Sequence, residues 1–312
     1  MKNKVLVTGG AGYIGSKLVT KLVELKYDVT VIDKIVYDKT SLFHLFNKKN
    51  FKLIKGDVTD IKILKKIIKN FDYIIPLAAL VGAPLCEKYP KEAIKINLKA
   101  IKLILANIKS NQRIIYTTTN SGYGIGLKGK FCDENTPLSP ISLYGQTKVD
   151  AEKEILKYKN SISLRLATVF GYSYRMRTDL LVNNFVLRAI KEKKIELFEP
   201  NFRRNFIYID DVVNGIIFSM MNFNKLKSNC YNLGLSNANI TKLKLARLIK
   251  EEIPSLKISI NENKKDPDKR DYFVSNRKIE SKGFKAKTSL NKGIKELKDI
   301  YSIKDNGYNN NY

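Results

Sequence analysis

A glycine-rich turn near the N-terminus constrains the fold of this chain more than any other feature. Residues 4–15 read Lys-Val-Leu-Val-Thr-Gly-Gly-Ala-Gly-Tyr-Ile-Gly, so an apolar run passes through the turn into a helical pattern. Gly10, Gly12 and Gly15 have the spacing GxGxxG, which permits a tight turn and close approach of the backbone to a pyrophosphate. The following helix would offer its free N–H groups and positive dipole to the phosphates. The turn therefore predicts a parallel α/β sheet that binds a dinucleotide.

Short apolar runs alternate with helical patterns along the first two-thirds of the chain, as in repeated βαβ units. We expect strands at residues 4–8, 28–32, 51–55, 73–77, 113–118 and 161–166, and helices at 13–25, 61–69, 91–108 and 143–158. After about residue 171 the alternation loosens. These patterns predict an α/β Rossmann fold, a doubly wound parallel sheet with a smaller mixed α/β C-terminal substrate-binding lobe. We place the cofactor domain at residues 1–170, with 205–235 returning to it, and the substrate lobe mainly at 171–312.

Charge and cysteine content argue against several other classes of protein. The 312 residues include 57 Lys plus Arg and 30 Asp plus Glu, a formal net charge of +27. The basic residues are spread over nearly every expected helix without stacking aromatics, so we expect no nucleic-acid partner, although an anionic small substrate would be attracted. No apolar run has the roughly 18 residues needed to cross a bilayer, so we expect no membrane segment. Three separated cysteines and one histidine favour a reducing cytoplasm and disfavour disulfides or a metal site.

Carboxylates after the second and third expected strands indicate which dinucleotide binds. Asp33 ends the second strand, where a ribose-binding carboxylate belongs. Its charge would repel a 2′-phosphate, so we expect NAD rather than NADP. Asp57 and Val58 end the third strand and are placed to meet the adenine.

Tyr144 and Lys148 supply the chemistry expected at the reacting end of the cofactor. They are four residues apart, hence on one face of a helix. A nearby ammonium favours the phenolate, which would lower the pKa of Tyr144 toward a value useful for a general base. The same ammonium can hold the cofactor ribose. Thr119, in a hydroxyl-rich strand end, can hydrogen-bond the alcohol that loses its proton.

With these motifs the chain resembles the extended short-chain dehydrogenase/reductase family that acts on nucleotide sugars. The matching residues are Thr8–Gly15, Asp33, Asp57-Val58, Leu77-Ala-Ala79, Asn97, Thr119 with Tyr123-Gly124, Tyr144 with Lys148, and Arg204–Asp211. The resemblance implies that Tyr144, Lys148 and Thr119 are catalytic. It implies that NAD is bound by Gly9, Gly12, Tyr13, Ile14, Gly15, Asp33, Asp57, Val58, Leu77, Ala78, Ala79, Asn97, Tyr144 and Lys148.

One departure from the family narrows the reaction. Family members that act as 4,6-dehydratases follow the Thr with Asp-Glu, whereas this chain has Asn120 and Ser121, which cannot supply a carboxyl proton. The remaining reaction is removal of hydride from a sugar carbinol, at carbon 4. The hydride is returned to the other face in an epimerase and is not returned in a dehydrogenase.

Several loops resemble a subgroup that contains the GDP-heptose 4-dehydrogenases of bacterial capsule synthesis. These loops are residues 80–86, 120–126, 165–171, 175–177, 179–183 and 266–271. The resemblance implies a GDP-linked heptose or hexose, in preference to a UDP-linked sugar. The substrate would be bound by Asn120, Ser121, Arg175, Arg177, Asn183, Arg204 and Arg270. An epimerase of the UDP-glucose 4-epimerase type, a ketosugar reductase and a non-catalytic NAD-binding protein are the alternatives.

The helices expected at residues 91–108 and 143–158 also suggest a homodimer. In related proteins the faces of these helices that point away from the sheet form a four-helix interface. The expected sheet-facing stripe on the first helix runs from Ile94 to Ile108, and Ile96 and Ile104 lie off it.

Overall fold

Seven parallel strands form the central sheet of the computed structural model, which describes residues 3–37, 39–127, 129–264 and 270–303. Their order across the sheet is β11-β7-β5-β4-β1-β2-β3. Strands β4 and β7 are buried along their whole length, as expected when helices cover both faces of a parallel sheet. The α/β fold predicted from the sequence is confirmed. The strands are β1 (Lys4–Thr8), β2 (Asp28–Asp33), β3 (Phe51–Lys55), β4 (Tyr73–Pro76), β5 (Arg113–Thr119), β7 (Ser161–Leu166) and β11 (Asn229–Leu233).

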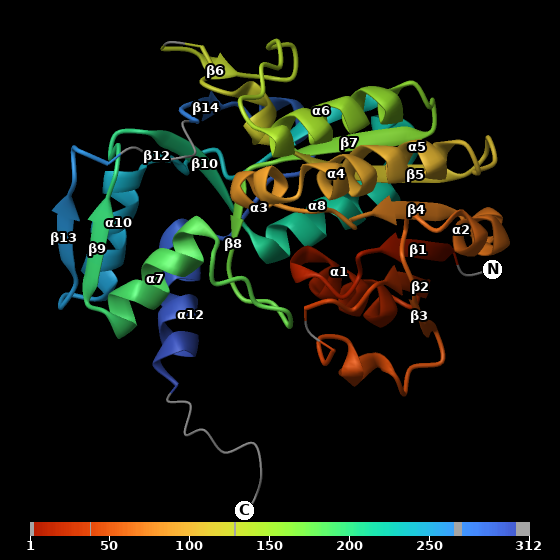
Figure 1. The fold of residues 1–312 in the computed structure, drawn as a ribbon, viewed down its shortest axis with the longest axis horizontal. Coiled ribbons are helices and arrows are strands. Elements are labelled where there is room, and N and C mark those ends of the chain that lie inside the picture. The colour runs from red at the N-terminus through yellow and green to blue at the C-terminus, as the bar shows by residue number, and fades with distance from the viewer. Residues whose placement is uncertain (1–2, 38, 128, 265–269, 304–312) are drawn as a thin grey trace, which may run out of the picture.

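Helices pack on both faces of this sheet (Figure 1). On one face α1 (Tyr13–Glu24) contacts α8 (Ile209–Met221), and on the other lie α2 (Ile61–Ile67), α5 (Ala100–Leu105) and α6 (Leu143–Leu156). Alternate residues of β1 face the two layers, because side chains in a strand point to opposite sides in turn. The shorter helical turns are η1 (Phe43–Leu45), η2 (Ile68–Asn70), α3 (Ala83–Lys88), α4 (Pro90–Ile94), η4 (Asn120–Tyr123), α9 (Phe223–Leu226) and α11 (Arg277–Glu280).

The strand order reverses between β1 and β4. The chain leaves β1 toward β2 and β3, but it leaves β4 toward β5 and β7. In sheets of this kind, ligands bind in the crevice outside the carboxyl ends of the strands at the reversal. Gly9, Asp33, Leu77 and Thr119 lie at the carboxyl ends of β1, β2, β4 and β5. The topology therefore gathers the predicted cofactor and catalytic residues at one edge.

A smaller lobe from the second half of the chain lies beside the sheet (Figure 1). Its helices α7 (Leu181–Lys191), α10 (Lys242–Glu252) and α12 (Leu290–Ser302) pack against one another. Residues 229–233 return to the central sheet as β11, beside β7, whereas β10 stays in the lobe. The small sheets are β12 (Asn239–Thr241) with β10 (Arg203–Tyr208) and β8 (Thr168–Phe170), β13 (Lys257–Ile260) with β9 (Lys194–Leu197), and β14 (Phe273–Val274) with β6 (Phe131–Cys132).

The helix expected at residues 91–108 contains a π-helical turn, η3 (Lys95–Lys99), between α4 and α5. A π turn adds one residue to the helical repeat and so rotates the apolar face that follows it. Ile94, expected on the sheet-facing stripe, is 37% exposed, whereas Ile104 is fully buried. The prediction that Ile104 lies off the stripe is therefore wrong, and it cannot face a dimer partner.

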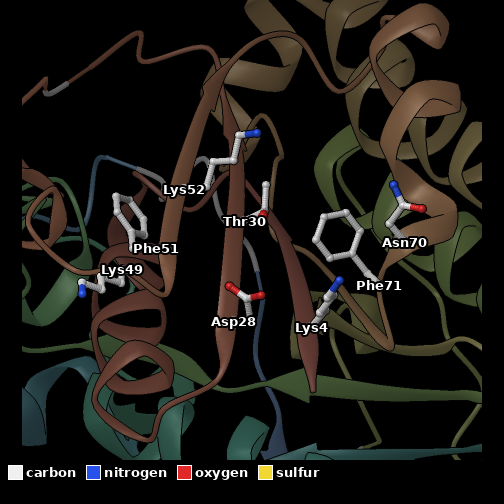
Figure 2. Close-up of a pocket in the computed structure, with 8 residues that line it drawn as sticks. All are labelled: Lys4, Asp28, Thr30, Lys49, Phe51, Lys52, Asn70 and Phe71. Atoms are coloured by element: carbon white, nitrogen blue, oxygen red, sulfur yellow. The ribbon is translucent and has the colours of Figure 1, made fainter. Parts of the chain in front are cut away.

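A shallow hollow occurs at the opposite edge of the sheet. Figure 2 shows that Lys4, Asp28 and Phe51 line it, and these residues begin β1, β2 and β3. Because it lies at the amino ends of the strands, it is remote from the carboxyl-end crevice. The hollow therefore lies apart from the predicted cofactor and catalytic residues.

Candidate active site

The glycine-rich turn brings β1, α1 and β4 so close together that side chains would not fit. Gly9 has a φ of +73°, and a Cβ there would lie 2.5 Å from the backbone N of Ala78. A Cβ on Gly15 would lie 2.4 Å from the carbonyl oxygen of Gly9. Gly12 is the N-cap of α1, and no side chain caps this helix. The first N–H groups of α1, from Tyr13 onward, therefore suit an anionic ligand.

Two carboxylates lie at the adjoining strand ends. Asp33 is half-buried, and its Oδ2 accepts a hydrogen bond from the N–H of Ala11 in the turn, at 2.9 Å. Asp57 Oδ1 accepts from the N–H and the hydroxyl of Thr59, each at 2.8 Å, and Oδ2 lies 3.1 Å from Lys34 Nζ. Burial opposes ionisation of Asp57, but these contacts outweigh it and lower its pKa. Asp57 is therefore held as an anion, and a carboxyl group at each of the two strand ends suits a ribose with free hydroxyls.

The segment after β4 forms one wall of the crevice, and Asn97 holds it from behind. Leu77, Ala78 and Ala79 are each partly exposed there, whereas Val58 is buried. Asn97 is 1% exposed; its Oδ1 accepts from the N–H of Leu80 at 2.8 Å, and its Nδ2 donates to Thr147 Oγ1 at 3.2 Å. Since protein groups use its amide, Asn97 positions the wall of the crevice. Its predicted contact with the cofactor stays a prediction.

The structure brings Tyr144 and Thr119 together. Tyr144 lies in the first turn of α6, which Ser142 caps, and Thr119 ends β5. The Thr119 hydroxyl lies close enough to the phenol to lower its pKa, and its Oγ1 lies 2.9 Å from Ser121 Oγ. The arrangement places two hydroxyl groups where one substrate alcohol can contact both.

The pKa of Tyr144 is raised in this structure because burial disfavours the phenolate. The positive charges of Arg177 and Arg270 and the nearby Thr119 hydroxyl oppose this effect without overcoming it. Lys148 is 5% exposed, and burial lowers its pKa from 10.5 to about 7. The predicted lowering of the Tyr144 pKa is therefore not seen in this structure, although an amine with a pKa of about 7 is still partly an ammonium at neutral pH.

The charges that act on Tyr144 come from the C-terminal half of the chain. Arg270 Nη1 is hydrogen-bonded to Ser121 Oγ, beside Thr119. Arg177 pairs with Asp179, with Nε 3.0 Å from Oδ1. The lobe therefore places two guanidinium groups near enough to the Tyr144 phenol to lower its pKa.

Arg204 is held at the same end of the lobe as Arg270. It lies in β10, is 3% exposed, and its guanidinium is 5.9 Å from the ring centroid of Tyr272. Its neighbour Arg203 is fixed to Asp271, with Nε 2.8 Å from Oδ1. Because residues 270–272 are tied to β10 in this way, the two predicted diphosphate contacts belong to one surface.

Arg175 and Asn183 are engaged by other parts of the protein. The Arg175 guanidinium is 4.4 Å from the ring centroid of Tyr37, which follows Asp33 at the ribose end of the crevice. Asn183 is fully buried, and its Nδ2 donates to the carbonyl oxygen of Arg177 at 2.9 Å. Asn183 therefore positions the loop that carries Arg177. Direct contact of either residue with a substrate stays a prediction.

Asn120 lacks any such engagement. It is 1% exposed, and neither polar atom of its amide has a hydrogen-bond partner within the ranges that the structure describes. Leaving a buried amide unpaired costs free energy. The structure therefore leaves Asn120 able to bond a ligand next to Thr119 and Ser121.

A family of enzymes matches the chain across these elements. Residues 5–234 match the NAD dependent epimerase/dehydratase family. The chain belongs to this family. It is accordingly an NAD-dependent enzyme of the kind that modifies nucleotide sugars. The cradle fits that cofactor, because the uncapped start of α1 suits a pyrophosphate and Asp33 suits a ribose without a 2′-phosphate.

Individual members of the family are similar over most of the chain. UDP-glucuronic acid decarboxylase 1 of Arabidopsis thaliana is 32% identical over 309 residues, which cover 94% of this chain and 68% of that protein. The structure of UDP-glucose 4-epimerase from Thermotoga maritima with UDP-glucose superposes with a TM-score of 0.82 at 24% identity, over 96% of this chain and 98% of that one. UDP-glucuronic acid 4-epimerase from Bacillus cereus, in complex with UDP-glucuronic acid and NAD, gives 0.82 at 23% identity over the same shares. The two structures establish the likeness in fold.

Sequence reasoning missed a buried polar network beyond Lys148 on α6. Glu152 Oε1 lies 2.6 Å from Arg165 Nη2, and its Oε2 accepts from Ser163 Oγ at 2.9 Å. Arg165 Nη1 donates to the Tyr123 hydroxyl at 3.0 Å, so Tyr123 is a core residue, 2% exposed. One indication was present in the sequence, since Glu152 stands four residues after Lys148 and continues the same face of the helix.

Other reactive groups contribute little to this site. Cys86 is fully buried, and burial raises the pKa of its thiol to about 11. Across the described ranges, no cluster of three His, Cys, Asp or Glu residues could hold a metal ion. No helix in the same ranges combines the length and apolarity that spanning a bilayer would need.

Proposed function

We propose that this enzyme oxidises carbon 4 of a UDP-linked sugar and returns the hydride to the other face, as a 4-epimerase does. The observation that carries the proposal is the proximity of the Tyr144 phenol and the Thr119 hydroxyl at the carboxyl end of β5. Arg177 and Arg270 act on the same phenol from the lobe side, where an anionic diphosphate would lie. The lack of a carboxylate at Asn120 and Ser121 disfavours elimination of water.

The cofactor would be held by the residues that line the crevice. Its pyrophosphate would lie on the turn and the start of α1, its ribose at Asp33 and its nicotinamide beside Tyr144 and Lys148. We assign this role to residues 1–170 together with α8 and β11, and the sugar nucleotide to the lobe formed mainly by residues 171–312. When bound, NAD supplies the hydride acceptor, and its cationic ring favours a nearby phenolate.

The chain's own residues would transfer the proton and hold the sugar in position. The Tyr144 phenolate takes the proton of the carbon 4 hydroxyl, while Thr119 donates a hydrogen bond to the same oxygen. Lys148, as an ammonium, stabilises that phenolate. Arg204 and Arg270 bind the diphosphate, so the ketone sugar stays tethered while it turns its other face to the cofactor.

A UDP-linked sugar is proposed ahead of the GDP-linked heptose expected from the sequence because the relatives described above carry UDP-linked sugars in their names. A GDP-linked heptose, with a place in capsule-precursor synthesis, is the second candidate, favoured by the loops that carry Arg175 and Asn183. We also propose a homodimer through the outer faces of α4 and α6, with the exposed Ile94 in place of the buried Ile104.

The test is to incubate the enzyme and NAD with UDP-glucose, UDP-glucuronic acid and a GDP-linked heptose, and to identify products by NMR. We expect inversion at carbon 4 of a UDP-linked sugar. Loss of carbon dioxide from UDP-glucuronic acid would identify a decarboxylase instead, because a ketone at carbon 4 makes a β-keto acid of the sugar carboxylate. Accumulation of NADH with the GDP-linked heptose would favour the second candidate.

The Tyr144→Phe variant is the control for the assignment of the base. It keeps the ring and loses the hydroxyl, so it should bind NAD with unchanged affinity and lose turnover by about 10²- to 10⁴-fold, the usual contribution of a general base. Full turnover in this variant would refute the assignment.

A further inference from the structure

Lys148 lies against an aromatic ring. Its Nζ is 4.1 Å from the ring centroid of Tyr116, and within the described part of the chain no carboxylate comes within ion-pair distance of it. Glu152, one turn further along α6, raises the pKa of Lys148 but is already bound to Arg165. The ring of Tyr116 is therefore the group that contacts the amine directly.

The surroundings of Tyr116 show that its ring, and not its hydroxyl, makes this contact. Tyr116 lies in β5, is 1% exposed and packs in the same apolar cluster as Ala151 and Ile155 of α6. Its hydroxyl has no hydrogen-bond partner among the described residues. Burying an unpaired hydroxyl costs free energy that phenylalanine would avoid. What Tyr116 offers Lys148 is the electron-rich face of the ring.

We propose that Tyr116 is a positioning residue whose ring face holds Lys148 as an ammonium beside Tyr144. The inference rests on the proposed function, since it concerns the same proton-transfer pair. A cation over an aromatic face is stabilised by the ring quadrupole, and most strongly where water is excluded. Burial, opposed in part by the charge of Glu152, lowers the pKa of Lys148 to about 7, so a contact that favours the ammonium raises the charged fraction at neutral pH.

The other charged groups near the pair are largely compensated. Arg165 on β7 is paired with Glu152, and Arg177 with Asp179. The thiol of Cys86 on α3 is neutral at physiological pH because its pKa is raised to about 11. The groups that act on Tyr144 or Lys148 are Glu152, Cys86, Thr119, Arg177 and Arg270. The ring of Tyr116 is the one aromatic face in contact with Lys148 among the residues described.

Two substitutions separate the ring from the hydroxyl. Tyr116→Leu removes the aromatic face and keeps an apolar side chain, whereas Tyr116→Phe keeps the face and is the matched control. In the Leu variant, kcat should fall on the alkaline side at a pH about 0.4 to 1.5 units lower than in the parent. This shift corresponds to the free energy of a cation–π contact. The Phe variant should retain the parent profile. An unchanged Leu profile, or equal shifts in both variants, would overturn the proposal.

A double-mutant cycle tests the contact without substrate or turnover. Urea unfolding of the parent, Tyr116→Leu, Lys148→Met and the double variant gives the coupling between the two side chains. We expect a coupling of about 2- to 30-fold in the unfolding constant at about pH 6, where the amine is charged, and none at about pH 10. A coupling equal at both pH values would mean packing alone and would overturn the proposal. If no sugar is turned over, the proposed function fails while this cycle still decides the role of Tyr116.

Loss of folding in the Leu variant would not end the test. Phenylalanine at position 116 can be replaced by progressively fluorinated phenylalanines, which keep the shape of the ring and weaken its negative face. The coupling to Lys148 should fall with each added fluorine, and a coupling that does not change across the series would refute the role of the ring.

Discussion

Replacing Lys148 by Met should stabilise the protein while abolishing turnover. Burial lowers the pKa of Lys148 from 10.5 to about 7, and one pKa unit corresponds to about 1.4 kcal/mol. The folded state therefore disfavours the ammonium by about 4 to 5 kcal/mol below pH 7, and the contact with Tyr116 recovers about 0.5 to 2 kcal/mol of this cost. We expect a net gain of about 2 to 4 kcal/mol in the free energy of unfolding at neutral pH.

The gain should depend on pH in one direction. The folded-state pKa lies below the unfolded one, so between pH 7 and 10.5 the unfolded chain binds more protons and stability rises with pH. The Met variant lacks this rise, and its advantage should vanish toward pH 10.5. Urea unfolding followed by circular dichroism at about pH 6.5 and about pH 9.5 measures the difference in unfolding free energy between the Met variant and the parent. Lys153→Met, at an exposed position, is the control. An advantage equal at both pH values, or a less stable variant at neutral pH, would refute the reasoning.

Two further predictions concern residues around this centre. Glu152→Gln leaves the buried Arg165 without its counter-ion and should cost about 3 to 5 kcal/mol in urea unfolding. The control Glu154→Gln removes a partly exposed carboxylate that pairs with Lys157 at the surface, and it should cost little. A loss below about 1 kcal/mol for Glu152→Gln would contradict the pairing. Arg175→Met removes the contact with Tyr37 and should raise the KM for NAD by about 2- to 30-fold while the KM for the sugar changes little. A change confined to the KM for the sugar would instead show that Arg175 binds the substrate.

Most of the cofactor half could be predicted from the sequence because its structure is encoded locally. Buried parallel strands appear as short apolar runs, and the turn between Gly9 and Gly15 has a backbone that few other sequences permit. The observed bounds of β1, β3 and β7 coincide with the predicted ranges. Tyr144 and Lys148 could be placed on one face of a helix from their spacing, because helix geometry fixes which side chains share a face.

Other features depend on contacts that spacing does not reveal. The π turn at Lys95–Lys99 has no sequence mark, so the spacing did not predict that Ile104 joins Ile101 on the buried face beyond it. In α12 the buried Leu290, Ile294 and Leu297 stand among lysines, which hid the helix. The pKa of Tyr144 could not be predicted from its neighbour because it depends on burial of both groups. Nothing in the sequence distinguishes Tyr116 from other strand residues, because its contact with Lys148 depends on how α6 packs against β5.

The position of β11 makes the two halves of the molecule inseparable. This strand comes from residues 229–233, far beyond the end of the cofactor half, and pairs with β7 along Ser161–Leu166. A fragment ended at residue 170 would leave the outer N–H and C=O groups of β7 without partners, a template for joining other chains. Such a truncation is expected to aggregate rather than bind dinucleotide, and any engineered split of this enzyme should keep β11 attached to β7.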